Sequence, residues 1–143
     1  TLRELHLASY DISNISGVTN LVNLSYLDLK YNKLTTNSIQ YLIQKKNNEV
    51  VQENTLLAEK IDLRGNEIID ISVFNDYPAN IKWLDLSENH IYDVAPISKH
   101  SCSQALYLQD QALQDNSPFH HQQKRCHQFL GRHLLSNPKK ALT

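Results

Sequence analysis

Apolar and polar residues alternate in five short segments of the chain, and all five follow one template. The template, L-x-x-L-x-L-x-x-N-x-L, fits LRELHLASYDI from Leu2, LSYLDLKYNKL from Leu24, AEKIDLRGNEI from Ala58, IKWLDLSENHI from Ile81 and SQALYLQDQAL from Ser103. Apolar-polar-apolar alternation in the middle of each segment predicts a half-buried strand. One such strand cannot bury its own apolar face, so we expect the five strands to stack around a shared core.

The template asparagine leads us to expect ordered turns in the inner repeats. It is present as Asn32, Asn66 and Asn89, whereas Tyr10 and Gln111 replace it in the outer repeats. A stacked amide can hydrogen-bond the backbone of the turn that leaves each strand. We therefore expect looser turns at both ends.

Three segments that follow these turns, ISNISGVTNL, IIDISVFNDY and IYDVAPISKH, share further apolar positions. We expect these positions to point into the core: Ile12, Ile15, Val18, Leu21, Ile68, Ile71, Phe74, Ile91, Val94 and Ile97.

The second repeat is longer than the others and predicts a helix. In NKLTTNSIQYLIQ, Thr36 or Asn37 is the expected N-cap, and Ile39, Leu42 and Ile43 fall at helical spacing. The following stretch, KKNNEVVQENT, is polar and lacks clear periodicity, so residues 44–57 are expected to project from the outer side as a loop.

The five segments resemble the repeats of the leucine-rich-repeat family. The short repeats are similar to those of bacterial internalin-like proteins, and the second is similar to the ribonuclease-inhibitor style of repeat. The resemblance implies an α/β solenoid, a short curved horseshoe with about five parallel strands on its concave face. This solenoid would span residues 1–116, with repeats starting near residues 2, 24, 58, 81 and 103.

The pattern changes at Ser117, where Ser-Pro is a good start for a helix. Cys126, Leu130 and Leu134 then lie on one helical face. We expect residues 117–137 to form a C-terminal capping helix over the last repeat and residues 138–143 to form a tail.

The template also predicts which side chains face away from the core, because side chains alternate along a strand. The central column is His6, Asp28, Asp62, Asp85 and Tyr107. The column before it is Glu4, Tyr26, Lys60, Trp83 and Ala105, and the column after it is Ala8, Lys30, Arg64, Ser87 and Gln109.

The aspartates of the central column allow two interpretations. Carboxylates on strands about 4.8 Å apart repel each other by on the order of 1 kcal/mol per pair, which folding alone would not select. They can form an acidic stripe that faces a ligand. Alternatively, Lys30, Lys60 and Arg64 offset the repulsion and leave a solvated, self-neutralised polar face.

Trp83 is the only tryptophan, and it occupies an outward position where nothing in the fold requires an indole. Contact with a partner is one interpretation, since aromatic residues dominate interface hot spots. Shielding of the sheet by packing over Tyr26 or a lysine stem is the other. The predicted partner-binding residues are Trp83, Asp85, Asp62, Asp28, Tyr26, Tyr31, Lys60, Arg64, Tyr107 and His6.

Composition narrows the classes of partner. Lys and Arg number 14 against 15 Asp and Glu, which does not favour nucleic acid. No apolar run approaches the roughly 18 residues of a membrane span. The two cysteines, Cys102 and Cys126, are too few for a disulfide framework and favour a reducing, intracellular location. The chain has no methionine, which indicates a fragment or a processed form.

Catalytic chemistry is not expected. His120, His121, His127 and His133 lie near Cys126, but they do not form pairs at metal-binding helical spacing with it. His100 and Cys102 are close in sequence, yet the pair lacks an identifiable oxyanion site. No phosphate-binding glycine motif or nucleophile motif is present, so we expect no cofactor, no metal and no small-molecule substrate.

The leading hypothesis is a protein-interaction module that binds another protein on its concave face. Its concrete form is a bacterial effector, delivered into the host cytosol, that covers the active site of an enzyme with a basic rim. One alternative is an adaptor or scaffold fragment of a larger protein. The other is a metal- or thiol-dependent activity in the C-terminal His/Cys segment.

Overall fold

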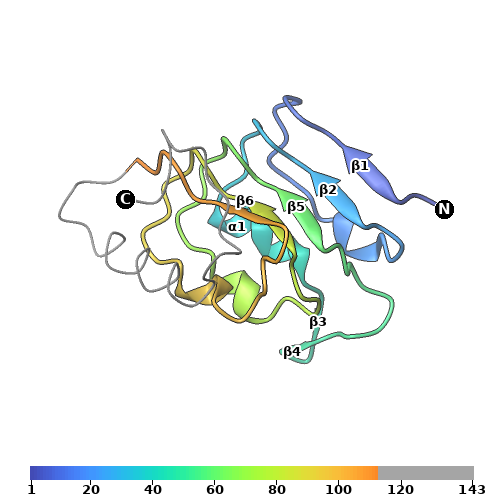
Figure 1. Cartoon of the computed structure of the whole chain (residues 1–143). Helices are drawn as coiled ribbons and strands as arrows, with labels where there is room; N and C mark the ends of the chain where they lie inside the picture. Colours follow the sequence, from blue (N-terminus) through green and yellow to red (C-terminus); the bar gives the residue numbers. More distant parts are fainter. Residues whose placement is uncertain (113–143) are drawn as a thin grey trace.

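Five short strands form one parallel sheet in the computed structural model, which describes residues 1–112 of the chain. The sheet order is β1 (Glu4–His6), β2 (Tyr26–Asp28), β5 (Lys60–Asp62), β6 (Trp83–Asp85) and β7 (Ala105–Tyr107). Figure 1 shows these strands side by side, in chain order, along one side of the molecule. The predicted solenoid with about five parallel strands is confirmed. The predicted capping helix at 117–137 and the tail at 138–143 lie outside the described residues.

The strands pair in the register that the template predicts. Leu5, Leu27, Ile61, Leu84 and Leu106 are aligned across the sheet, and the last four are fully buried. Because side chains alternate along a strand, the residues on either side of this row face away from the core. The predicted outward columns are therefore confirmed as rows of paired residues, from Glu4 to Ala105 and from His6 to Tyr107.

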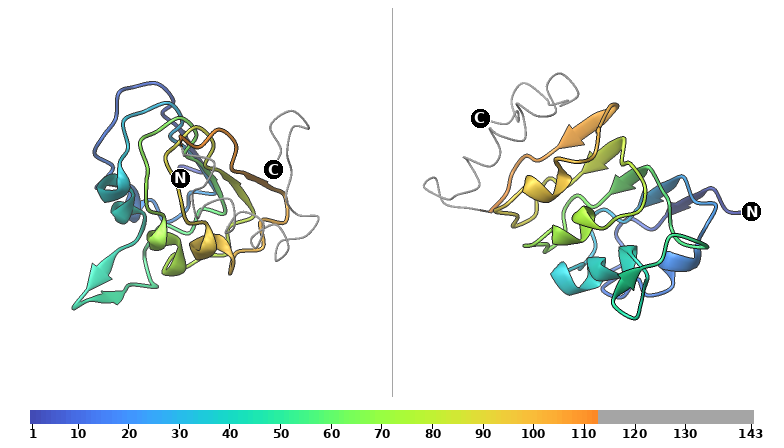
Figure 2. Two further views of the ribbon diagram at one scale, coloured as in Figure 1. Left: turned by 90° about the vertical axis from the view of Figure 1, so that its left-hand side faces the viewer. Right: turned by 90° about the horizontal axis from the view of Figure 1, so that it is seen from below.

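Short helical turns return the chain on the opposite side of the core. Three are 3-10 helices: η1 (Val18–Asn20), η3 (Ser72–Asn75) and η4 (Ala95–Ile97). Figure 2 shows them facing the strands across the core. The apolar residues predicted to point inward do so, with Ile12 and Leu21, near the β1 end, only partly buried.

The return of the second repeat is a single helical turn, α1 (Thr36–Ile39), followed by the 3-10 helix η2 (Gln40–Leu42). The predicted N-cap, Thr36 or Asn37, was wrong, because Thr35 caps the helix in a reciprocal pair of hydrogen bonds with Ser38. The Thr36 hydroxyl instead accepts hydrogen bonds from the backbone amides of the next repeat, at residues 69 and 70. The predicted buried stripe of Ile39, Leu42 and Ile43 is confirmed.

Residues 44–57 contain a β-hairpin where we expected a loop without regular structure. Strand β3 (Lys45–Lys46) pairs antiparallel with β4 (Glu49–Val50). Asn47 and Asn48 both adopt positive φ, 52° and 64°, which is the conformation that a tight hairpin turn needs. The hairpin projects away from the parallel sheet (Figure 2).

A ladder of side-chain amides connects the turns. Asn66 accepts a hydrogen bond from the backbone N–H of Leu34 and donates to the carbonyls of Leu29 and Leu63. Asn32 and Asn89 make the equivalent bonds in their repeats. Gln111 continues the ladder, accepting from Ile91 and donating to Leu86. The expectation of a looser turn at Gln111 was therefore wrong, because its longer amide reaches the same backbone groups.

One backbone conformation recurs just before each ladder position. Five equivalent residues have φ between 56° and 70°: Ser9, Tyr31, Gly65, Glu88 and Asp110. This left-handed conformation turns the chain away from the strand. Only residue 65 is glycine, although the conformation costs other residues roughly 1–2 kcal/mol. The repeated turn therefore comes from the packing of the solenoid more than from the local sequence.

Candidate functional site

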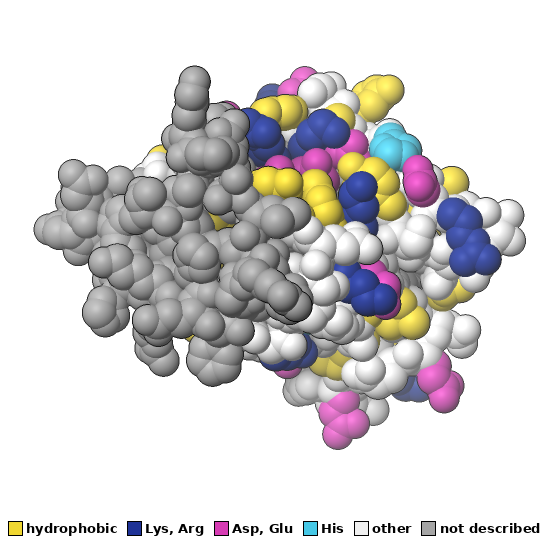
Figure 3. All heavy atoms as spheres, viewed as in Figure 1, with side chains coloured by type: hydrophobic (Ala, Val, Ile, Leu, Met, Phe, Trp, Pro, Cys, Tyr) yellow, Lys and Arg dark blue, Asp and Glu magenta, His cyan; other side chains and the backbone are white. Residues whose placement is uncertain are grey.

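A hollow of about 470 Å³ lies on the outward face of the parallel sheet, over strands β2, β5, β6 and β7. Its lining is Lys30, Tyr31, Asp62, Arg64, Trp83, Asp85, Ser87, Tyr107, Gln109 and Asp110. Acidic, basic and hydrophobic side chains gather beside one another over the strands (Figure 3). The hollow thus combines aromatic surface with charged groups.

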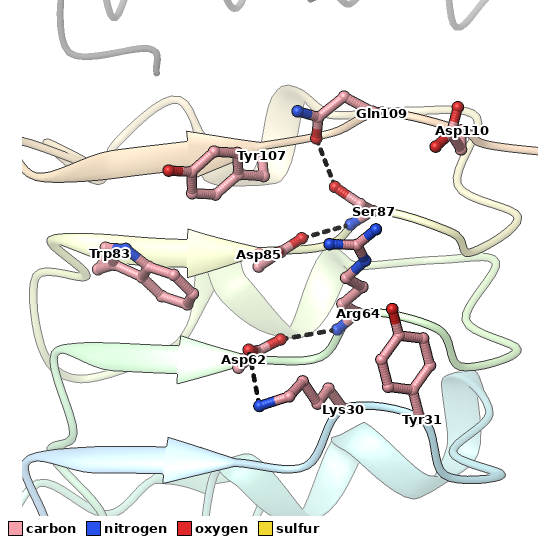
Figure 4. Close-up of a pocket in the computed structure, with 10 residues that line it drawn as sticks. All are labelled: Lys30, Tyr31, Asp62, Arg64, Trp83, Asp85, Ser87, Tyr107, Gln109 and Asp110. Atoms are coloured by element: carbon pink, nitrogen blue, oxygen red, sulfur yellow. Dashed lines mark hydrogen bonds and ion pairs between the residues drawn. The ribbon is translucent and has the colours of Figure 1, made fainter. Parts of the chain in front are cut away.

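Two aspartates form the floor of the hollow (Figure 4). Asp62 is 5% exposed and Asp85 is 7% exposed. Their Oδ1 atoms accept hydrogen bonds from the backbone amides two residues later, Arg64 N at 3.1 Å and Ser87 N at 2.9 Å. Burial, with a smaller contribution from the neighbouring carboxylates, raises the pKa of Asp62 to about 6 despite the opposing effects of the Arg64 amide and Lys30. Burial also raises the pKa of Asp85.

The third aspartate of the column, Asp28, has nearby basic groups. Lys30 Nζ lies 2.8 Å from Asp28 Oδ2, and His6 Nδ1 lies 3.6 Å from the same oxygen. Burial alone would raise the pKa of Asp28, but the hydrogen bonds and charge of Lys30 outweigh it, so the pKa falls below its ordinary value. The column therefore holds one well-neutralised carboxylate beside two that are buried with less compensation.

Arg64 lies across one side of the hollow and is held by a neighbouring repeat. Its Nε donates to Glu88 Oε2 at 2.6 Å, and the Tyr31 hydroxyl donates to the same oxygen at 3.1 Å. The guanidinium carbon is 5.9 Å from the centre of the Tyr31 ring. Sequence reasoning missed Glu88, because nothing in the template indicates that this turn residue reaches the preceding repeats.

A row of rings and one lysine runs along the other side of the face. Lys60 Nζ is 4.2 Å from the Tyr26 ring centre and 4.9 Å from the Trp83 ring centre. Edge-to-face contacts join Trp83 to Tyr26 at 6.4 Å and to Tyr107 at 5.8 Å. His6 extends the row, with its ring centre 4.9 Å from that of Tyr26. The Lys60 ammonium is thus placed between two aromatic faces.

A family model gives independent support to the repeat. Residues 23–44 match the Leucine Rich Repeat model. This segment contains β2 and α1, which is the only α-helical return within residues 1–112, and the register of β2 is repeated by the other four strands of the parallel sheet. The fold is accordingly that of a small leucine-rich-repeat solenoid. No curated protein matches the chain at a significant level.

A leucine-rich-repeat domain implies a protein-binding module of a generally non-catalytic kind. Among residues 1–112, no group of three His, Cys, Asp or Glu side chains is arranged to hold a metal ion. The same residues include no helix that is long and apolar enough to span a membrane. The His/Cys segment that includes Cys126 lies outside the described residues.

His100 and Cys102 belong to the core of the solenoid. His100 Nδ1 accepts a hydrogen bond from Ile81 N at 3.1 Å, and Nε2 lies 2.8 Å from the Phe74 carbonyl, to which it donates in that tautomer. Both ring nitrogens are therefore engaged with the backbone, and burial lowers the pKa of the imidazole. Cys102 is also buried. A histidine held in this way positions two loops and is not available to activate the thiol.

All ten residues predicted to bind a partner lie on or beside the outward face of the sheet, and six of them line the hollow. The interpretation of the aspartates as part of a solvated polar face needs correction, because all three are buried by the longer side chains around them, while the acidic stripe that faces a ligand stays a prediction. Ser87, Gln109 and Lys30, which also line the hollow, were placed on this face by the template but not selected. The position of these three residues in the repeat template was the signal that indicated them.

Proposed function

We propose that the solenoid binds a partner protein with its outward sheet face, centred on the hollow over Asp62 and Asp85. The observation that carries this proposal is the half-buried Trp83, which lies beside buried carboxylates on a face that no other described segment covers. Large aromatic side chains next to partly desolvated charges are typical of interface hot spots.

The size of the face supports a protein partner. Five parallel strands at about 4.8 Å spacing span roughly 20 Å, and a standard interface needs about 800 Å² on each partner. The hollow is partly open and its lining mixes charged, polar and aromatic groups, whereas small-molecule sites are usually enclosed and mostly apolar. Its mixed rim of charged and aromatic groups suits an interface with a polar periphery.

The finer form of the proposal is an enzyme partner with a basic rim, covered by this face. Buried carboxylates at the centre of the face favour a basic surface opposite them, because complementary charges steer association and fix the register of docking. The resemblance to small bacterial leucine-rich-repeat proteins supports a role as an effector in the reducing cytosol of a host cell.

In the test, the chain is immobilised to recover candidate partner proteins. Each recovered protein is then purified, and its affinity for the chain is measured. Trp83→Ala and the double variant Asp62→Lys, Asp85→Lys are compared with the parent, with Tyr41→Ala as the matched control on an exposed aromatic residue far from the sheet face. Loss of the Trp83 ring should weaken binding by about 2 kcal/mol or more, whereas Tyr41→Ala should leave it unchanged. If a purified partner binds both sheet-face variants as tightly as the parent, the proposed surface is wrong.

A further inference from the structure

The cations that line the hollow are already engaged with carboxylates other than Asp85. Lys30 Nζ lies 2.8 Å from Asp28 and 3.9 Å from Asp62, so its closer partner is Asp28. Arg64 Nε is bound to Glu88 at 2.6 Å. Among residues 1–112, Asp85 has no basic side-chain nitrogen within 4.0 Å, although it is more than nine-tenths buried and accepts a hydrogen bond from Ser87 N at 2.9 Å. The charge of Arg64 acts on Asp85 from outside ion-pair distance, but this cation is bound to Glu88, so a further cation from outside would improve the environment of the buried carboxylate.

The aromatic wall stands directly beside these carboxylates. Trp83 precedes Asp85 by two residues on the same face of β6, and Tyr107 is paired with Asp85 across to β7. Figure 4 shows both rings on one side of the floor and Arg64 on the other. A group seated over Asp85 would therefore contact aromatic surface and carboxylate oxygens at the same time.

We propose that this hollow is the subsite for one arginine side chain of the partner protein, with its guanidinium over Asp62 and Asp85 and against Trp83 and Tyr107. The inference deepens the proposed function and rests on it. Two carboxylates on adjacent strands offer several acceptor oxygens to the fork of donors on a guanidinium. The planar, weakly hydrated guanidinium also stacks on aromatic rings better than a lysine ammonium.

The chain itself contains a precedent for this recognition. Lys60 is held between Tyr26 and Trp83 on the adjoining part of the same face. Arg64 likewise pairs with a carboxylate while lying near a ring, that of Tyr31. Anionic ligands such as phosphate suit the hollow poorly, because the floor is acidic and both lining cations are already paired.

The first experiment uses short peptides and the single tryptophan of the chain as the reporter. The full chain is titrated at pH 7.5 with acetyl-Gly-Arg-Gly-amide, and Trp83 fluorescence and amide NMR shifts are followed. The controls replace arginine by citrulline, which has nearly the same shape but no charge, and by lysine. We expect saturable binding of the arginine peptide, about tenfold weaker binding of the citrulline peptide and an intermediate affinity for the lysine peptide.

Variants identify the floor of the subsite. Asp85→Asn and Asp62→Asn should each weaken the arginine peptide at least about fivefold, and Asp76→Asn, at an exposed position away from the sheet face, should not. Circular dichroism checks that each variant is folded, and the second floor variant serves if the first does not fold. Equal affinity for the arginine and citrulline peptides, or unchanged affinity in both floor variants, would overturn the arginine subsite.

The two proposals fail in different ways. If Trp83→Ala abolishes binding of the purified partner while the arginine peptide shows no preference over citrulline, the face binds a protein but the subsite is wrong. If the arginine peptide binds as expected while the partner is indifferent to Trp83→Ala, the hollow binds arginine but the partner docks elsewhere, and the proposed function is wrong for that partner.

Discussion

The ring of Tyr31 lies against the backbone of Gly65 and leaves no space for a β-carbon there. An ideal β-carbon on residue 65 would be 2.3 Å from Cδ1 of Tyr31. Gly65 also has a φ of 70°, a conformation that residues with a β-carbon adopt at a cost in free energy. The conformation favours glycine at this turn, which leads from β5 beside the hollow, and the contact with Tyr31 requires it.

Gly65→Ala should therefore destabilise the chain by about 1–2 kcal/mol, measured by urea denaturation. Displacement of the Tyr31 ring should also break its hydrogen bond to Glu88 and change the rim of the hollow. Gly17→Ala is the matched control, because no atom lies within 4 Å of its added β-carbon and its φ is −81°. A loss of stability in the control as large as that at residue 65 would contradict the explanation.

Asn66→Ala should be one of the most damaging substitutions in the described part of the chain. The side chain is buried and bonds the backbone of two repeats, at Leu34, Leu29 and Leu63. Removing it leaves buried backbone groups without partners, so we expect a loss of about 2–4 kcal/mol in the free energy of unfolding. Asn20→Ala, at an exposed position, should change it by less than about 0.5 kcal/mol. Equal effects at the two sites would argue against the ladder.

His100 should make the folded state sensitive to acid. Burial holds the pKa of His100 below its ordinary value of 6.5, so the unfolded chain binds a proton at higher pH than the folded chain does. Stability due to this group is therefore complete above pH 6.5 and falls as the pH drops from 6.5 toward the lowered pKa. Urea denaturation from pH 7.5 to 5 should show this decline. The His100→Gln variant should lose the part of the pH dependence of stability that is due to His100. An unchanged slope in the variant would contradict the prediction.

Asp62→Asn should stabilise the chain at pH 7.5, and Asp28→Asn should destabilise it. The pKa of Asp62 is raised to about 6, so its ionised form is disfavoured in the folded state. The contribution of this carboxyl group to the stability of the chain therefore falls as the pH rises from 4 through 6. An asparagine keeps the acceptor for Arg64 N without the charge. After solvent screening the gain should be about 1 kcal/mol.

The Asp28 variant should change the stability in the opposite direction, because Lys30 lowers the pKa of Asp28. The ionised form of Asp28 is therefore the favoured one in the folded state. Thermal or urea denaturation of both variants at pH 7.5 checks the pair. A gain in stability for Asp28→Asn, or a loss for Asp62→Asn, would contradict the assignment of charges along the column.

The repeat template determined the parallel sheet, its register and the identity of the outward rows, because a period of two along a strand fixes the face of every side chain. It also indicated the amide ladder at Asn32, Asn66 and Asn89. The template did not indicate that Gln111 would serve in the same ladder, since one extra methylene still reaches the same carbonyls.

Burial and pairing on the outward face were decided only by the tertiary structure. The sequence placed Asp62 and Asp85 in an outward column, but stacking set the longer side chains of neighbouring repeats around them and withdrew them from water. It also brought Glu88 to Arg64 and Tyr31, a contact that depends on how successive turns are stacked. Strand periodicity assigns a side chain to a face, whereas its solvation and charge partners depend on neighbours that are distant in the chain.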